Sequence, residues 1–66
     1  MEETVEDLEE ELQETLAKIE NIAARVTEKE IDAYVGFMES EKYKDKVVEI
    51  GHKLKERGVD ITTLTQ

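Results

Sequence analysis

The sequence contains no cysteine and no proline, and only one of its 66 residues is a histidine. The absence of cysteine excludes disulfide bonds, thiolate zinc sites and cysteine nucleophiles. A single histidine, His52, cannot supply a cluster of nitrogen ligands to a metal. We therefore expect no cofactor and no metal site. A chain of this length buries a small core, so stability must come from well-formed helices, ion pairs or another subunit.

Long apolar runs are also missing. No stretch of 18 apolar residues occurs, so we expect no transmembrane helix and no membrane partner. The N-terminus is acidic and lacks the basic and apolar regions of a signal peptide, which predicts a cytoplasmic protein. The net charge is −9. Nucleic acid is not the expected partner, because a phosphate-binding surface must be positive at least locally.

Charged residues make up 41% of the chain and aromatic residues 5%. Glutamate and lysine dominate the charged set, while thermolabile asparagine, glutamine and methionine are scarce. This balance is typical of hyperthermophile proteins and predicts a thermostable protein. A designed bundle would have a similar composition. Gly36 and Gly51, however, lie inside expected helices, where a designer would place alanine.

The longest pattern in the chain is an apolar stripe with steps of three and four residues. Such spacing places its members on one face of an amphipathic helix, which we predict over residues 4–26. Thr4 is the expected N-cap, with Asp7 in the capping-box position. The stripe consists of Val5, Leu8, Leu12, Leu16, Ile19, Ile22, Ala23 and Val26.

A second helix is predicted over residues 28–40. Thr27 followed by Glu30 fits a capping box, and Val26 with Ile31 fits a hydrophobic staple around the same cap. These signals predict a tight corner at Thr27. The core-facing residues of this helix would be Ile31, Tyr34, Val35 and Met38.

A third helix is predicted over residues 41–57, with Ser40 as its N-cap. Its apolar face consists of Tyr43, Val47, Ile50 and Leu54. Gly58 ends this helix in a Schellman motif, with Val59 packing back on Leu54. Ile61 and Leu64 in the tail are expected to cover the open end of the core.

These elements predict an all-α fold, a small three-helix bundle formed by residues 1–66 as a single domain, with a short C-terminal tail on the core. One alternative remains open. The second and third helices would merge through Ser40 into a helical hairpin, which would expose more apolar surface and would have to dimerise.

Two surfaces are candidates for contacts. Ala33, Gly36 and Phe37 lie on the side of the second helix away from its predicted core face, where one large side chain stands among small ones. This group is the candidate protein-contact surface. The alternative is that Phe37 tucks into the core. The acidic N-terminal half of the first helix is a further place for a basic partner to bind.

A basic stripe on the third helix is the other candidate surface, formed by Lys42, Lys46, Lys53 and Arg57. We interpret it as a flank that pairs with the acidic first helix, with lysine stems covering apolar surface. The alternative is a helix-turn-helix-like regulator that binds nucleic acid through this stripe. Against that alternative, the start of the third helix offers no Arg, Asn or Gln for bidentate base contacts.

No residue set predicts catalysis. The letters Glu49-x-x-His52 match a carboxylate-histidine metal motif, but both side chains fall away from the apolar face. Ser40 and His52 are three turns apart, so no nucleophilic triad can form. We therefore expect a small, non-catalytic protein-interaction or accessory module, whose partner is another protein or a second copy of itself.

Overall fold

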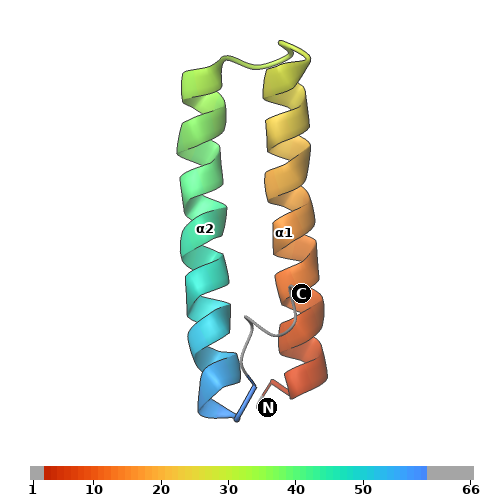
Figure 1. The fold of residues 1–66 in the computed structure, drawn as a ribbon, viewed down its shortest axis with the longest axis vertical. Helices are drawn as coiled ribbons and strands as arrows, with labels where there is room; N and C mark the ends of the chain where they lie inside the picture. Colours follow the sequence, from red (N-terminus) through yellow and green to blue (C-terminus); the bar gives the residue numbers. More distant parts are fainter. Residues whose placement is uncertain (1–2, 60–66) are drawn as a thin grey trace.

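The computed structural model describes residues 3–59 and shows two antiparallel helices joined by a short loop. Helix α1 spans Val5–Thr27 and helix α2 spans Ala33–Glu56, so the start of α1 and the end of α2 lie at the same end of the hairpin (Figure 1). The all-α prediction is confirmed. The three-helix bundle is wrong, because residues 33–56 form one continuous helix. The molecule has the hairpin architecture that was the alternative.

The first helix begins where the sequence indicates. The Asp7 amide donates a 3.0 Å hydrogen bond to Thr4 Oγ1, and the Thr4 amide donates to Asp7 Oδ2 at 3.3 Å. This reciprocal capping box satisfies two amide donors that have no partner within the helix. The predicted N-cap is confirmed.

The predicted corner at Thr27 is wrong, because Thr27 is the last residue of α1. Its hydroxyl donates back to the Ala23 carbonyl at 3.0 Å and so cannot cap a following helix. The chain leaves α1 through a Schellman motif, in which the Glu30 amide donates to the Arg25 carbonyl at 2.8 Å. Lys29 holds the left-handed position of this motif, with φ of 61°.

The second helix begins instead at Asp32, whose Oδ1 accepts a 2.8 Å hydrogen bond from the Tyr34 amide. Ser40 is not an N-cap. It is a half-buried residue within α2, where nothing stops the helix, since proline is absent and helix formation propagates cooperatively. The predicted boundary at residues 40–41 therefore does not exist.

The end of α2 agrees with the sequence prediction. Gly58 has φ of 83°, and the Val59 amide donates to the Leu54 carbonyl at 2.9 Å, the long-range bond of a Schellman motif. Val59 packs against the core cluster that contains Leu54. Ile61 and Leu64, which were expected to cover the core, lie outside the described residues.

The core is a single seam between the two helices, with the three- and four-residue steps of a coiled coil. Every seam position is buried or half-buried. Those of α1 are Val5, Leu8, Leu12, Thr15, Ile19, Ile22 and Val26, and those of α2 are Gly36, Ser40, Tyr43, Val47, Ile50 and Leu54. Ala23, expected in the apolar stripe, is exposed, and Thr15 is buried at 6% exposure.

The predicted core face of the second helix is wrong. Tyr34, Val35 and Met38 are exposed, and only Ile31 of that set is half-buried. The reason is the register of the long helix. Because α2 runs on to Leu54, its seam is set by residues 43–54, and the same steps carried backwards reach Gly36 instead of its larger neighbours.

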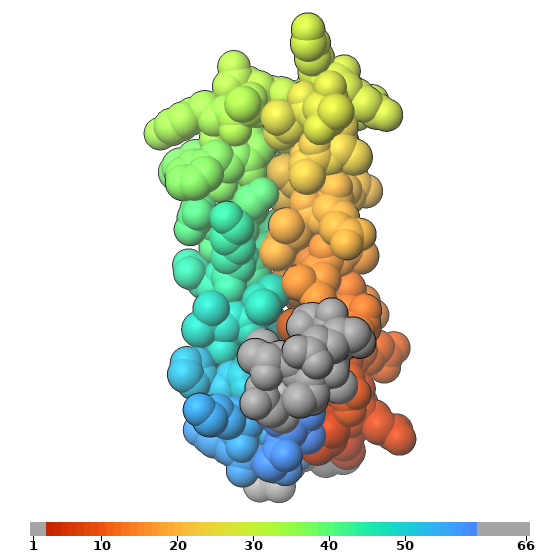
Figure 2. All heavy atoms as spheres, viewed as in Figure 1, coloured from red at the N-terminus to blue at the C-terminus, as the bar shows by residue number. Residues whose placement is uncertain are grey.

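The hairpin is only one helix thick. Its principal extents are 40 × 26 × 14 Å, and the shortest of these is close to the diameter of one helix with its side chains. Figure 2 looks along that short axis and shows, in its upper half, the side chains of α1 and α2 meeting along one line. Among residues 3–59, each helix therefore has a neighbouring helix on one side alone.

Candidate functional site

The structure divides the predicted contact surface of Ala33, Gly36 and Phe37. Ala33 and Phe37 are exposed. Gly36 is buried against α1, so it cannot contribute to an outer surface. An ideal Cβ on Gly36 would lie 3.5 Å from Ile22 Cγ2 and would meet Val26 Cγ2 even more closely. Phe37 is not a core residue, which excludes the alternative placement.

Four large apolar side chains flank Gly36 in the sequence and project from α2 in the directions that do not face α1, with Val35 and Phe37 on opposite flanks of the helix; we call them the tip surface. Their exposed fractions are Tyr34 69%, Val35 45%, Phe37 56% and Met38 49%. Of residues 33–38, only Gly36 is buried. The first turns of α2 are therefore apolar on the solvent side. Single exposed apolar residues are ordinary, but contiguous ones mark interaction sites.

The tip surface has an acidic border. Asp32 precedes it in the chain and Glu39 follows it, and both are exposed. In the adjoining loop, Glu30 forms a 3.6 Å ion pair with Arg25. A partner for this surface therefore needs an apolar centre, and basic groups at its edge would be complementary.

Of the basic stripe formed by Lys42, Lys46, Lys53 and Arg57, Lys46 and Lys53 are half-buried and lie against the acidic flank of α1, whereas Lys42 and Arg57 are exposed. Lys46 Nζ is 2.9 Å from Glu11 Oε1, and Lys53 Nζ is 3.5 Å from a carboxylate oxygen of Glu3. Half of the stripe is thus paired within the hairpin, as the first interpretation predicts.

The ion pair between the helices perturbs one titration. The hydrogen bond that Lys46 donates to the Glu11 carboxylate raises the pKa of the lysine above its ordinary value of 10.5, and the negative charge of Glu11 adds to the effect. The ammonium form is favoured because it keeps both interactions. Lys46 therefore stays charged and engaged at physiological pH.

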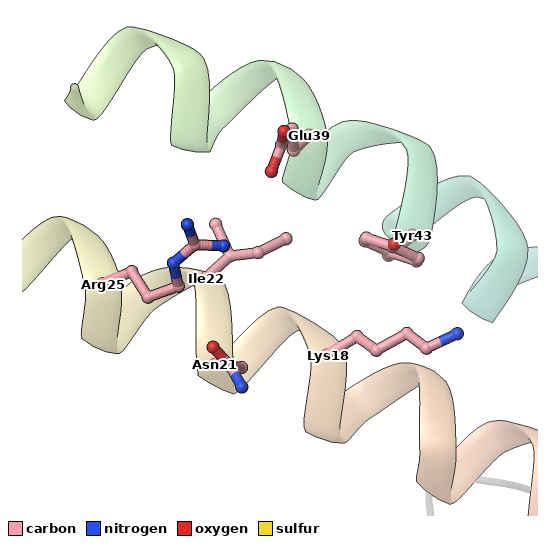
Figure 3. Close-up of a pocket in the computed structure, with 6 residues that line it drawn as sticks. All are labelled: Lys18, Asn21, Ile22, Arg25, Glu39 and Tyr43. Atoms are coloured by element: carbon pink, nitrogen blue, oxygen red, sulfur yellow. The ribbon is translucent and has the colours of Figure 1, made fainter. Parts of the chain in front are cut away.

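The groove on this side of the hairpin holds two shallow hollows. One, of about 220 Å³, is lined by Lys18, Asn21, Ile22, Arg25, Glu39 and Tyr43. In Figure 3, Arg25 of α1 points toward α2, and Glu39 points back toward α1. Lys18 Nζ lies 5.7 Å from the centre of the Tyr43 ring, a cation–π distance. Charges of both signs line this groove, unlike the mostly apolar walls of a small-molecule site.

The residues with the letters of a metal motif do not converge. Glu49 and His52 are both exposed, and Glu49 pairs with Lys53 at 3.5 Å. Among residues 3–59, no three histidine or acidic side chains are grouped closely enough to hold a metal ion. Within the same described part of the chain, no helix is long and apolar enough to cross a bilayer.

Comparison with protein-family models, with curated proteins and with solved structures gave no match. The surfaces of the hairpin are therefore the basis for any functional argument.

Proposed function

We propose that this protein is a small, non-catalytic protein-interaction module, and that the tip surface makes the contact. The observation that carries the proposal is the exposure of four large apolar side chains around the first turns of α2. Each fully buried residue of this kind contributes about 1.5–3 kcal/mol relative to exposure in water. A partner that covers the tip surface would gain part of that energy.

The arrangement of the hairpin supports the same proposal. Phe37 projects outward while its neighbour Gly36 faces α1, so the aromatic ring is available without unfolding of the core. Aromatic residues are enriched among the side chains that dominate binding energy at interfaces. Phe37→Ala should change the free energy of unfolding of the hairpin without its partner by less than about 0.5 kcal/mol, as for most surface substitutions. It should nevertheless weaken the complex.

The test is site-specific crosslinking in the cells from which the chain derives. A photo-crosslinking amino acid replaces Phe37 in one variant and Glu10 in a matched control, because Glu10 is also exposed but lies on α1. The proposal expects a discrete crosslinked product, either heterologous or a second copy of the chain, at position 37 and not at position 10. Equal or absent crosslinking at both positions would reject it.

The nucleic-acid alternative remains a prediction that no observation here favours. The three-helix frame on which it depended is replaced by a hairpin. In addition, Lys46 and Lys53 of the basic stripe are engaged by carboxylates of α1.

A further inference from the structure

We infer that the partner of the apolar side of α2 is a second copy of this chain, and that two hairpins stack face to face through an antiparallel α2–α2 contact. This inference rests on the proposed function and names the partner. Its central observation is a row of four residues on α2, here called the outer row: Phe37, Glu41, Lys44 and Val48.

The outer row is a continuous stripe. Its spacing of four, three and four residues keeps the side chains within an arc of about 60° at 3.6 residues per turn. That arc lies about a quarter turn away from the seam with α1. Phe37 is 56% exposed and Val48 58% exposed, so both ends of the stripe are apolar and open to solvent. Between them, Lys44 Nζ lies 3.7 Å from Glu41 Oε1, and both side chains are about half exposed.

The order of the row is self-complementary. When a second α2 helix runs antiparallel with its two-fold axis between Glu41 and Lys44, Phe37 lies opposite Val48 of the copy. Glu41 then lies opposite the copy's lysine at position 44. The axis repeats both contacts, as an isologous interface requires. Apolar groups meet apolar groups and opposite charges meet, which is the pattern that stabilises paired helices.

The residues of α1 near the proposed two-fold axis are also compatible with this arrangement. The Lys46–Glu11 ion pair and the Lys18–Tyr43 contact place residues 41–44 of α2 beside the middle of α1. Leu16, half-buried, lies there on the side of the hairpin away from Lys18, so two copies of Leu16 would meet at the axis. The pattern therefore extends across both helices of the hairpin.

The other way to stack two hairpins matches less well. A two-fold axis parallel to the helices would place α2 of one copy on α1 of the other at the same height. Glu11 lies beside Lys46, so Val48, two residues later in α2, would face Glu9, two residues earlier in the antiparallel α1. An exposed valine would then be covered by a carboxylate, which costs desolvation energy without a partner. The antiparallel α2–α2 arrangement avoids this contact.

The exposed area of the hairpin agrees with a dimer. The chain exposes 5232 Å², whereas a folded monomer of 7.6 kDa is expected to expose about 4300 Å². The excess of about 900 Å² is close to the ~800 Å² that each partner buries in a standard interface. Within residues 3–59 nothing covers either face of this layer, which is 14 Å thick, whereas stable domains pack two layers. A second hairpin supplies the missing layer and produces a four-helix bundle.

The experiment is a charge swap across the proposed axis, read by sedimentation equilibrium of the whole chain at physiological salt. The wild type should sediment as a dimer. Glu41→Lys alone and Lys44→Glu alone each place like charges opposite one another twice per dimer, so each should weaken dimerisation about tenfold. The double variant Glu41→Lys/Lys44→Glu restores opposite charges and should return to within about threefold of the wild type.

Glu39→Lys is the matched control, since it makes the same charge change on α2 on the side away from the outer row, and it should leave the dimer intact. Phe37→Ala should weaken dimerisation at least tenfold, whereas Val35→Ala, on the other side of α2, should not. All these positions are exposed or half-buried, so circular dichroism should report folded helices in every variant.

A wild type that stays monomeric at all concentrations overturns the inference. So does a dimer that the single charge variants leave unchanged or that the double variant fails to restore. If the monomeric chain still crosslinks through position 37 to a different protein, the proposed function stands and only the choice of partner fails. Monomeric behaviour without any crosslink rejects both.

Discussion

The Cγ2 methyl group of Val26 occupies the space into which a Cβ atom on Gly36 would project. Glycine at this position therefore sets how closely α2 approaches α1 beside the loop. The same approach turns the neighbouring large side chains outward, because position 36 takes the inward direction. A packing contact between two small groups thus creates the exposed apolar surface on which the proposed function depends.

Replacing Gly36 with alanine should destabilise the hairpin. Alanine gains about 1 kcal/mol in helix propensity over glycine, but overpacking costs about 1–3 kcal/mol. Valine is stiff at χ1 and cannot easily move aside. We expect Gly36→Ala to lower the free energy of unfolding by about 1 kcal/mol in urea denaturation. In the double variant with Val26→Ala, the alanine at 36 should no longer be harmful; if it remains so, the close approach is not the cause.

Capping substitutions separate the observed hairpin from the predicted three-helix layout. Asp32→Ala removes the side chain that accepts from the Tyr34 amide and should cost about 1 kcal/mol. Thr27→Ala should change stability by less than about 0.5 kcal/mol, because the hydroxyl of Thr27 bonds only to a carbonyl of its own helix. Chemical denaturation measures both. If Thr27→Ala lowered stability more than Asp32→Ala, Thr27 would be the N-cap of a helix, as in the three-helix layout.

Lys29 adopts the left-handed conformation that favours glycine. The left-handed region costs a residue with a side chain about 1–2 kcal/mol. Lys29→Gly should therefore raise the free energy of unfolding, by about 0.5–1 kcal/mol once the greater entropy loss of glycine is subtracted. Glu28→Gly is the control, since Glu28 has φ of −82° and gains nothing from glycine. Thermal unfolding should shift upward for the first variant and downward for the second.

Thr15 places a hydroxyl in the seam, where it donates to the Glu11 carbonyl at 2.8 Å. Such back-bonding slightly destabilises a helix, and the carbonyl keeps its backbone partner without it. Thr15→Val keeps the branched shape and buries a methyl group instead. We expect a gain of about 0.5–1 kcal/mol in stability. Calorimetry measures the gain. Thr27→Val, at an exposed position with the same kind of hydrogen bond, should show little gain in the free energy of unfolding.

The Lys46–Glu11 pair predicts a stability change at alkaline pH. Because folding raises the pKa of Lys46, its contribution is complete below the unfolded value of 10.5 and disappears as pH rises through the higher folded value. Wild type should therefore be more stable than Lys46→Gln at neutral pH, and this difference should shrink above pH 10.5. Lys42→Gln is the control, since Lys42 has no carboxylate partner among residues 3–59. A difference that does not vary with pH would contradict the assignment.

Part of the exposed apolar surface could be recognised without the fold. Phe37 lies outside the predicted apolar stripes, so it was predicted to form a contact surface with Ala33 and Gly36, of which Gly36 is in fact buried. Tyr34, Val35 and Met38 were predicted to lie in the core, because a short helix has to bury its large apolar residues. The spacing of the apolar residues from Leu54 back to Tyr43 could have indicated the correct core position. When the same steps of three and four residues are continued through Ser40, they reach Gly36.

Local chemistry in the sequence determined that the chain is helical, that α1 starts at Thr4 and that Gly58 ends α2. These features depend on hydrogen bonds and side-chain periodicity within a few residues, so no distant contact is needed to decide them. Only the tertiary structure decided that the helix continues through Ser40 and that Gly36 faces inward. The energies that settle these two points come from Val26, Ile22 and the rest of α1 across the hairpin, and glycine and serine carry no apolar signal of their own.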